Sequence, residues 1–237
     1  MGINLKILIV LAYWNRPNMV KNALNSIKEM NYDNWELAFI DDGSDPDKIG
    51  EPIVRDILQD HLHKIKFIRS TTKMEERVEQ GHHGLFMNYA IVISEADVVI
   101  TLCDDDAITK DYFTNINNFF TNNPNEVWGY SHCVAFDPTT QDYHDAPLIA
   151  NHFTDGHTGR IAPACNVDSS QVACRTKCTR QDGVYWNFPQ TWCLDQSFFE
   201  KMYAKYGACP FMGCIGQYKG IFSDQMGKRG IFKPNIL

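Results

Sequence analysis

Short apolar runs alternate along the first half of the chain with segments in which apolar positions recur every three or four residues. The runs predict strands that are buried on both faces of a sheet, because neither face of such a strand is polar. They lie at residues 7–11, 35–40, 65–68, 98–102 and 127–136.

The periodic segments predict helices, since apolar residues at i, i+3, i+4 and i+7 share one helix face. Pro17 and Pro52 suit the first turns of two of them. In a third, at residues 83–94, the predicted core-facing stripe is Phe86, Tyr89, Ala90 and Ile93. Strands alternating with helices predict an α/β fold, a mostly parallel sheet with helices on both faces. The 237 residues fit a single domain of this kind.

Polar residues directly follow three of the predicted strands, at residues 15–16, 41–47 and 104–106. Parallel strands end at the same edge of a sheet, and ligands bind beyond those carboxyl ends. The sequence therefore predicts a binding site where these three segments meet.

The third segment, Asp104-Asp105-Asp106, is a run of three carboxylates. Without a partner they would repel one another and resist ionisation together. A divalent cation such as Mg²⁺ or Mn²⁺ removes that conflict, and both ions prefer oxygen ligands. The alternative is a solvated turn in which an aspartate caps the next helix. The residues alone leave these two interpretations open.

The second segment begins with Asp41-Asp42-Gly43-Ser44, which is either a plain turn or a place where a carboxylate accepts a hydrogen bond from a base or a ribose. Neither the glycine-rich dinucleotide motif nor the P-loop motif is present in the sequence. A dinucleotide-dependent oxidoreductase and a P-loop NTPase are therefore not expected.

Charge and cysteine content narrow the function further. The formal net charge of −7 argues against nucleic acid or an anionic membrane as the main partner. No apolar run approaches the roughly 20 residues of a membrane span. The eight cysteines form no C-x-x-C pair, so we expect free thiols and a cytoplasmic protein.

Several of these segments together resemble family 2 glycosyltransferases with the GT-A fold, a Rossmann-like α/β fold. The first strand running into residues 13–17, the segment Phe39-Ile40-Asp41-Asp42-Gly43-Ser44, and Leu102-Cys103-Asp104-Asp105-Asp106 match that family's opening, its V-D-D-G-S segment and its D-x-D position. Residues 76–91, 163–168 and 194–199 look like segments of the bacterial spore-coat polysaccharide type.

The resemblance implies a nucleotide-sugar-binding half at residues 1–108 and an acceptor-binding half at 109–237. Nucleotide-binding residues would be Ala12, Tyr13, Asn15, Arg16, Asp41, Asp42, Arg77, Asp104 and Asp105. Metal ligands would come from Asp104, Asp105 and Asp106, with Mn²⁺ or Mg²⁺ as the cofactor. Many GT-A enzymes add a late histidine as a ligand, but the last histidine here is His157. We therefore expect weak, exchangeable metal binding.

On the acceptor side, the resemblance implies Asp195 as the catalytic base and Asp168 as an acceptor-binding residue. Asp195 also suits a helix N-cap, and both roles are compatible. Aromatic residues including Trp186 and Trp192 crowd the stretch before Asp195. They could stack on an acceptor sugar, although core packing is at least as good an account of each ring.

The function implied is an inverting, metal-dependent hexosyltransferase that uses a nucleoside diphosphate sugar, such as the UDP-sugar UDP-glucose, and transfers the sugar to a glycan or another hydroxyl acceptor. A homo-oligomer is compatible with this function. The alternatives are a catalytically weak sugar- or nucleotide-binding module of the same fold and a nucleotidyltransferase. The latter normally carries a glycine-rich basic loop after the first strand, where this chain has residues 14–17.

Overall fold

Four parallel strands form one half of a central sheet in the computed structural model, which describes residues 3–71, 82–136, 149–152, 159–162, 167–187 and 194–220. Their order is β3 (Ile65–Arg69), β2 (Trp35–Asp41), β1 (Ile7–Tyr13) and β4 (Val98–Cys103). All of β2 is buried, and β1 is nearly so. That burial explains why both strands are apolar along their length. All four runs that predicted these strands are confirmed.

The other half of the sheet contains both parallel and antiparallel strand pairs. β9 (Val172–Arg175) is antiparallel to β4, and β6 (Trp128–Phe136) is antiparallel to β9, so β6 runs the same way as β4. β10 (Cys209–Gly220) lies parallel to β6. Shorter strands pair antiparallel to these two, namely β5 (Ala107–Ile108) and β8 (Arg160–Ile161) with β10 and β7 (Ile149–His152) with β6.

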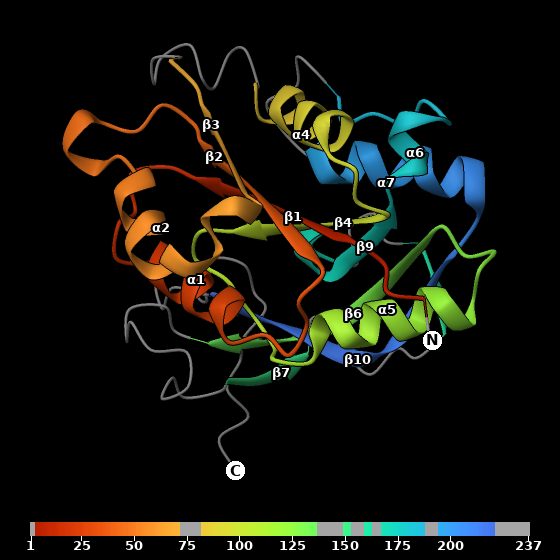
Figure 1. Cartoon of the computed structure of the whole chain (residues 1–237). Coiled ribbons are helices and arrows are strands. Elements are labelled where there is room, and N and C mark those ends of the chain that lie inside the picture. The colour runs from red at the N-terminus through yellow and green to blue at the C-terminus, as the bar shows by residue number, and fades with distance from the viewer. Residues whose placement is uncertain are drawn as a thin grey trace.

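Helices cover both faces of the sheet, as the alternating pattern predicts (Figure 1). One face carries α1 (Val20–Lys28), α2 (Glu51–Ile57) and α5 (Tyr112–Asn122), and the other carries α4 (His83–Ile93), α6 (Lys177–Arg180) and α7 (Leu194–Tyr206). Short 3₁₀ segments span Pro46–Lys48, Gln59–Lys64 and Ser169–Gln171.

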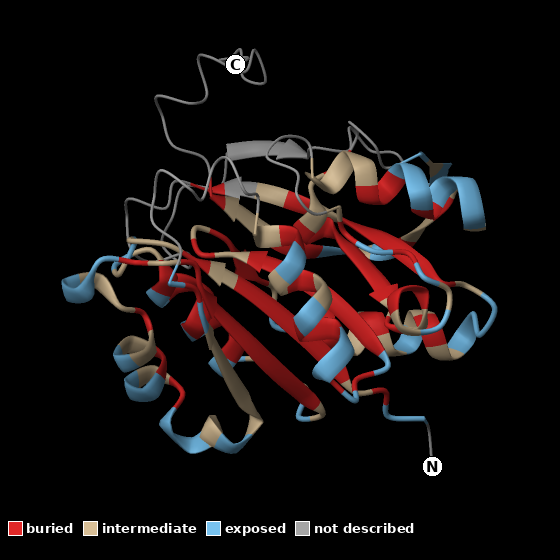
Figure 2. Cartoon of the chain, turned by 90° about the horizontal axis from the view of Figure 1, so that it is seen from above, coloured by how far each residue is buried: buried red, intermediate tan, exposed pale blue. Residues whose placement is uncertain are grey.

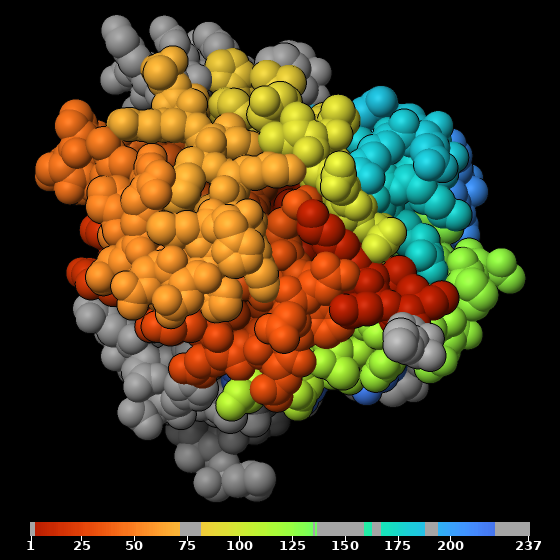
Figure 3. Space-filling view, in the orientation of Figure 1, coloured from red at the N-terminus to blue at the C-terminus, as the bar shows by residue number. Residues whose placement is uncertain are grey.

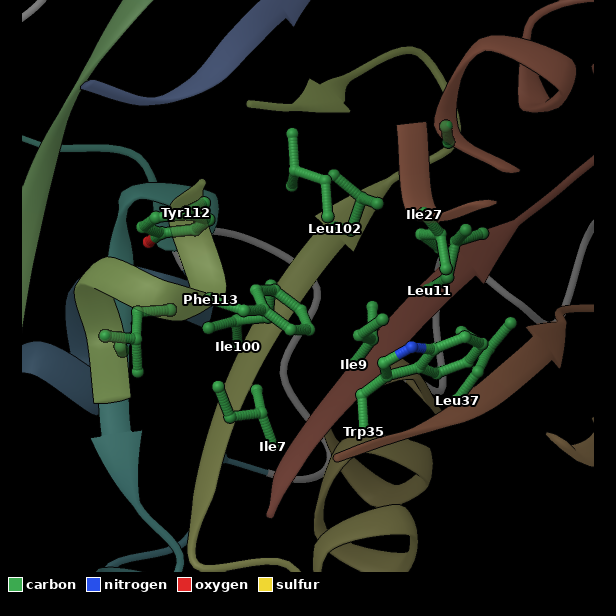
Figure 4. Close-up of a cluster of buried hydrophobic side chains, with 14 of the residues drawn as sticks. Ile7, Ile9, Leu11, Ile27, Trp35, Leu37, Ile100, Leu102, Tyr112 and Phe113 are labelled. Atoms are coloured by element: carbon green, nitrogen blue, oxygen red, sulfur yellow. The ribbon is translucent and has the colours of Figure 1, made fainter. Parts of the chain in front are cut away.

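Side chains alternate along β1 and so divide the core into two clusters. Ile7, Ile9 and Leu11 face α1 and α5, where Figure 4 shows them beside side chains of β2 and β4. Leu8 and Val10 face α4 and α7. Figure 2 shows the buried strands between helices whose outer faces are exposed. The α4 segment meets α6 at the surface (Figure 3).

The predicted core stripe of α4 is wrong in part. The helix buries Met87, Ala90 and Ile91, whereas Tyr89 is 50% exposed and Ile93 lies at the surface as well. The helix carries apolar residues on all of its own sides, so the spacing of apolar residues alone did not identify the face that packs on the sheet.

Two further features of the described residues bear on the expectations from composition. None of the helices in this part of the chain is both long enough and apolar enough to cross a membrane. The six described cysteines are free thiols, as expected, and they are Cys103, Cys133, Cys174, Cys178, Cys209 and Cys214.

Candidate functional site

The loops that follow β1 and β2 are joined by hydrogen bonds at the carboxyl edge of the sheet. The backbone N–H of Asn15 donates to Ser44 Oγ (3.0 Å), and Asn15 Oδ1 accepts from the N–H of Asp45 (2.8 Å). Asn15 has a φ of 54°, in the left-handed region that asparagine tolerates better than most residues. Asn15 therefore fixes the relative position of the two loops.

Asp41 and Asp42 are both buried at the end of β2. The two carboxylate oxygens of Asp41 accept hydrogen bonds from the N–H groups of Ser44 (2.9 Å) and Gly50 (3.1 Å). The N–H of Asp42 donates to the carbonyl of Tyr13 (3.0 Å). Asp41 thus shapes the turn from inside, and Asp42 lies against the end of β1.

Tyr13, the last residue of β1, is bound to the segment that follows β2. Its hydroxyl donates to the carbonyl of Lys48, and its ring packs on Phe39. Burial, together with the negative charges of Asp41 and Asp104, raises the pKa of Tyr13 to about 12. The phenol therefore stays protonated at neutral pH and acts here as a donor.

The acidic turn, residues 104–106, follows β4 and is bound to the β1 loop through Arg16. One guanidinium nitrogen of Arg16, Nη1, contacts Asp104 Oδ1 (3.1 Å) and Asp105 Oδ2 (3.0 Å). The N–H of Trp14 also donates to Asp104 (3.2 Å). The Arg16 side chain is 42% exposed. The structure therefore brings together the polar segments that follow β1 and β4, nearly 90 residues apart.

Asp106 is fully buried and is bound by the end of β10. Its oxygens accept from Lys219 Nζ (2.8 Å) and from the N–H of Gly220 (3.0 Å). Lys219 Nζ also lies 3.2 Å from Asp168. Burial lowers the pKa of Lys219, but the charges of Asp106 and Asp168 raise it by more, so the lysine stays protonated.

Lys219 was missed by sequence reasoning. It lies in a strand whose register is irregular and whose partner, β6, comes some 80 residues earlier. A single lysine near the end of a chain resembles any solvated surface lysine. The pairing of β10 with β5, the strand directly after the acidic turn, brings it to Asp106, and this long-range pairing leaves no local pattern that could identify the lysine.

Asp168 stands before β9, which runs antiparallel to β4 and so begins at the same edge. Its side chain accepts from the N–H of Ser170 (3.0 Å), and Gln171 Oε1 accepts from the N–H of Asp168 (3.0 Å), which forms a capping box. Burial raises the pKa of Asp168, but Lys219 and the bonds from Ser170 outweigh it, so the pKa is lowered.

Asp195 lies in the first turn of α7, and its Oδ1 accepts from the N–H of Gln196 (2.9 Å). α7 ends just before β10 begins, and β10 runs toward the acidic turn. The start of α7 therefore lies toward the carboxyl edge of the sheet. The closeness of Gly84, at the start of α4, to Leu194 agrees with this placement, since a Cβ at Gly84 would lie 3.2 Å from Leu194 Cδ1.

Of the predicted aromatic residues, the structure places Trp186 in the core. Its ring stacks on Phe198 with centroids 4.3 Å apart, and it is 6% exposed. Both hydrogen-bonding groups of the Asn88 amide hold the backbone of Trp186, at 2.9 Å each. Arg77 and Trp192 lie outside the described residues.

The end of β4 offers one suitable ligand for a hard divalent cation, the carboxylate of Asp105. Cys103 Sγ and one carboxylate oxygen each of Asp105 and Asp106 lie within 4.8 Å of one another. Burial raises the pKa of the Cys103 thiol well above its usual range, so it is a poor ligand for such an ion. Asp105 is partly exposed, and its carboxylate fits the oxygen preference of Mg²⁺ and Mn²⁺.

Burial of Asp104 predicts a distinct pH dependence of stability. Burial raises its pKa from 3.8 to about 6, although Arg16 opposes the shift. Between these values the folded state holds a proton that the unfolded state releases, so lowering the pH favours folding. The free energy of unfolding of the wild type, relative to Asp104→Asn, should therefore rise as the pH falls from about 6 to about 4.

Urea unfolding of both proteins at a series of pH values, without added metal, measures this difference. The comparison isolates Asp104, because the other carboxylates titrate in both proteins. A difference that falls over the same range would mean that Arg16, and not burial, dominates the environment of Asp104.

Comparison with known proteins identifies a family and a curated protein to which this chain is similar. The sequence profile of the family described as Glycosyl transferase family 2 matches residues 8–177. The curated protein CgeD of Bacillus subtilis (strain 168) is 23% identical over 128 residues, which is 53% of this chain and 29% of CgeD.

Solved structures share the fold. S. aureus TarS 1-349 in complex with UDP-GlcNAc has a TM-score of 0.67 and 16% identity, over 91% of this chain and 58% of that one. The mannosyltransferase PcManGT from Pyrobaculum calidifontis, in complex with GDP-Man and Mn²⁺, has a TM-score of 0.62 and 14% identity, over 93% and 58%. The chain thus spans less than two thirds of each of these relatives.

Proposed function

Because the chain belongs to glycosyl transferase family 2, we propose that it transfers a sugar from a nucleoside diphosphate donor, most simply a UDP-sugar such as UDP-glucose, to a hydroxyl acceptor. The observation that carries this proposal is the meeting of three loops at one edge of the sheet. Arg16 binds the acidic turn, and Asn15 binds the β2 loop. Ligands of doubly wound sheets bind at such an edge.

The nucleotide would occupy the ends of β1 and β2. Asp42 is buried beside the backbone of Ala12 and Tyr13, where a carboxylate can accept a hydrogen bond from the base. Asp41 and Asn15 keep the two loops in place. Asp104, at the end of the neighbouring strand β4, is proposed to bind the ribose.

The diphosphate would lie over the acidic turn. Arg16 is a partly exposed guanidinium at this turn, and guanidinium groups suit phosphate oxygens. Arg77 is proposed to contribute a second positive charge. Asp105 would hold Mn²⁺ or Mg²⁺ together with the diphosphate and water. When bound, that ion offsets the negative charge that develops on the leaving nucleoside diphosphate.

The acceptor would approach from the side of β9 and α7. Asp195 is half-buried in the first turn of α7, where the helix N-terminus favours a negative charge. It is proposed to take the proton of the acceptor hydroxyl while the sugar carbon is attacked on the face opposite the leaving group, which inverts its configuration. Asp168, whose side chain is 29% exposed, is proposed to bind the acceptor.

A thermal-shift screen of nucleotide sugars, each with and without Mn²⁺, tests the proposal. A ligand that binds the folded state raises the apparent stability with the logarithm of its concentration over Kd. We expect UDP and UDP-sugars to raise the melting temperature more with Mn²⁺ than without it, and adenine nucleotides to have less effect. No shift with any nucleotide would overturn the proposal. A shift without sugar transfer or slow donor hydrolysis, over a broad acceptor panel, would favour a binding module.

A further inference from the structure

A buried lysine bridges two carboxylates that come from different parts of the chain. Lys219 Nζ lies 2.8 Å from Asp106 and 3.2 Å from Asp168. Its side chain is 13% exposed, and that of Asp106 is completely buried. A buried charge needs a partner of opposite sign, and each of these groups supplies one to the other.

The residue after Lys219 completes the enclosure of Asp106. The N–H of Gly220 donates to Asp106 Oδ1 (3.0 Å), while Lys219 donates to Oδ2. A Cβ atom at Gly220 would lie 1.9 Å from the carbonyl oxygen of Asp105, so only glycine allows this approach. Both oxygens of Asp106 are therefore bound by β10, and the strand lies directly against the acidic turn.

The other cation at the turn is held differently. A single nitrogen of Arg16 is shared between Asp104 and Asp105, and its side chain is about three times as exposed as that of Lys219. The Arg16 side chain therefore approaches the turn from the surface, whereas Lys219 is enclosed.

We propose that Lys219 is a positioning residue that withholds Asp106 from the metal and leaves Asp105 as the carboxylate of the turn that binds the cation. This inference rests on the proposed function. Lys219 supplies the positive charge that Asp106 requires, so a divalent ion is needed only by Asp105 and the donor diphosphate. Metal binding without nucleotide is weak for that reason.

The same lysine ties the acceptor side to the donor side. Asp168 precedes the 3₁₀ turn Ser169–Gln171, and Gln217 of β10 donates to the carbonyl of Ser170. Lys219 adds an ion pair to this contact. The acceptor-side segment is therefore held at a fixed distance from the metal-binding turn through β10.

Paired variants of the turn test the assignment by a binding readout. Mn²⁺ binding is measured by the paramagnetic resonance signal of the free ion, with and without UDP. Asp106→Asn should keep Mn²⁺-dependent UDP binding within about threefold of the wild type, because the amide oxygen of the new side chain still accepts from the N–H of Gly220. Asp105→Asn should lose that binding. Equal losses in the two variants, with both cooperatively folded, would overturn the assignment.

Removing Lys219 should strengthen the binding of Mn²⁺, the opposite of the loss expected for Asp105→Asn. Lys219→Met leaves Asp106 buried without its positive partner, which lowers the melting temperature. It also releases a carboxylate to the ion, so Mn²⁺ alone should bind about tenfold more tightly than to the wild type, since affinity grows with ligand charge. Unchanged Mn²⁺ affinity in a folded Lys219→Met protein would contradict the proposal.

The double variant Lys219→Met/Asp106→Asn covers the case in which the single variant does not fold. It removes both charges and should regain most of the melting temperature and the weak Mn²⁺ binding of the wild type. Additive losses in metal-free unfolding would show that the two residues are not coupled, against the proposal. This unfolding result stands even if UDP does not bind the wild type, which would instead contradict the proposed function.

Discussion

Asp105→Asn should lower the affinity for UDP measured in the presence of Mn²⁺ by on the order of 100-fold, while leaving the weaker metal-free affinity nearly unchanged. A metal contact to the diphosphate contributes several kcal/mol, and each 1.4 kcal/mol is a tenfold change. Asp105 is the partly exposed member of the acidic turn and pairs with Arg16, whereas the carboxylates on either side of it are also bound by backbone N–H groups. Its removal leaves the ion without a protein carboxylate.

Isothermal titration with UDP, with and without Mn²⁺, measures both affinities. Asp60→Asn is the matched control, because it removes the same charge from an exposed aspartate before β3, at the opposite end of the parallel strands. The control should behave as the wild type does. If Asp105→Asn bound UDP as tightly as the control in Mn²⁺, the metal would have to rest on other groups.

The parallel half of the sheet could be predicted because its strands are buried on both faces. Residues such as Leu8 and Ile9 point to opposite helical layers, so both must be apolar, and the sequence shows an unbroken run. The places where these strands end carry Asn15, Asp41 and Asp104, which the fold brings to one edge. That edge followed from the order of elements alone.

The mixed half of the sheet could not be predicted in the same way. β9 enters between β4 and β6 although it comes later in the chain, and β10 crosses to the far side of β6. Such pairings depend on packing between distant segments, so they produce no periodic pattern of apolar residues in the local sequence. Lys219 belongs to this half, and so its contact with Asp106 was found only in the structure.

Trp186 shows a second limit of sequence reasoning. An aromatic residue near a presumed site is apolar in either role, and nothing in its neighbours separates a stacking platform from a core side chain. In the structure its ring packs on Phe198, and Asn88 holds its backbone. The burial of Trp186 depends on how α4 and α7 pack around it, and the spacing of residues along the chain does not encode that packing.

Asp195→Asn should reduce the rate of sugar transfer by about 10²- to 10⁴-fold, the usual contribution of a general base. Affinity for UDP should stay at the wild-type value, because Asp195 belongs to α7 and not to the loops after β1, β2 and β4 that are proposed to bind the nucleotide. An amide keeps the size of the side chain and can still accept from Gln196, but it cannot take a proton from the acceptor.

Initial rates with the donor and acceptor found by screening, together with UDP titrations, separate the two effects. Glu200→Gln is the control on the same helix, since Glu200 is exposed and lies further along α7. A base acts in the chemical step, so the loss should fall on kcat and leave the KM for the donor unchanged. A variant at Asp195 that transferred sugar at the full rate would show that the base lies elsewhere. A variant that lost UDP affinity instead would make Asp195 part of the nucleotide site.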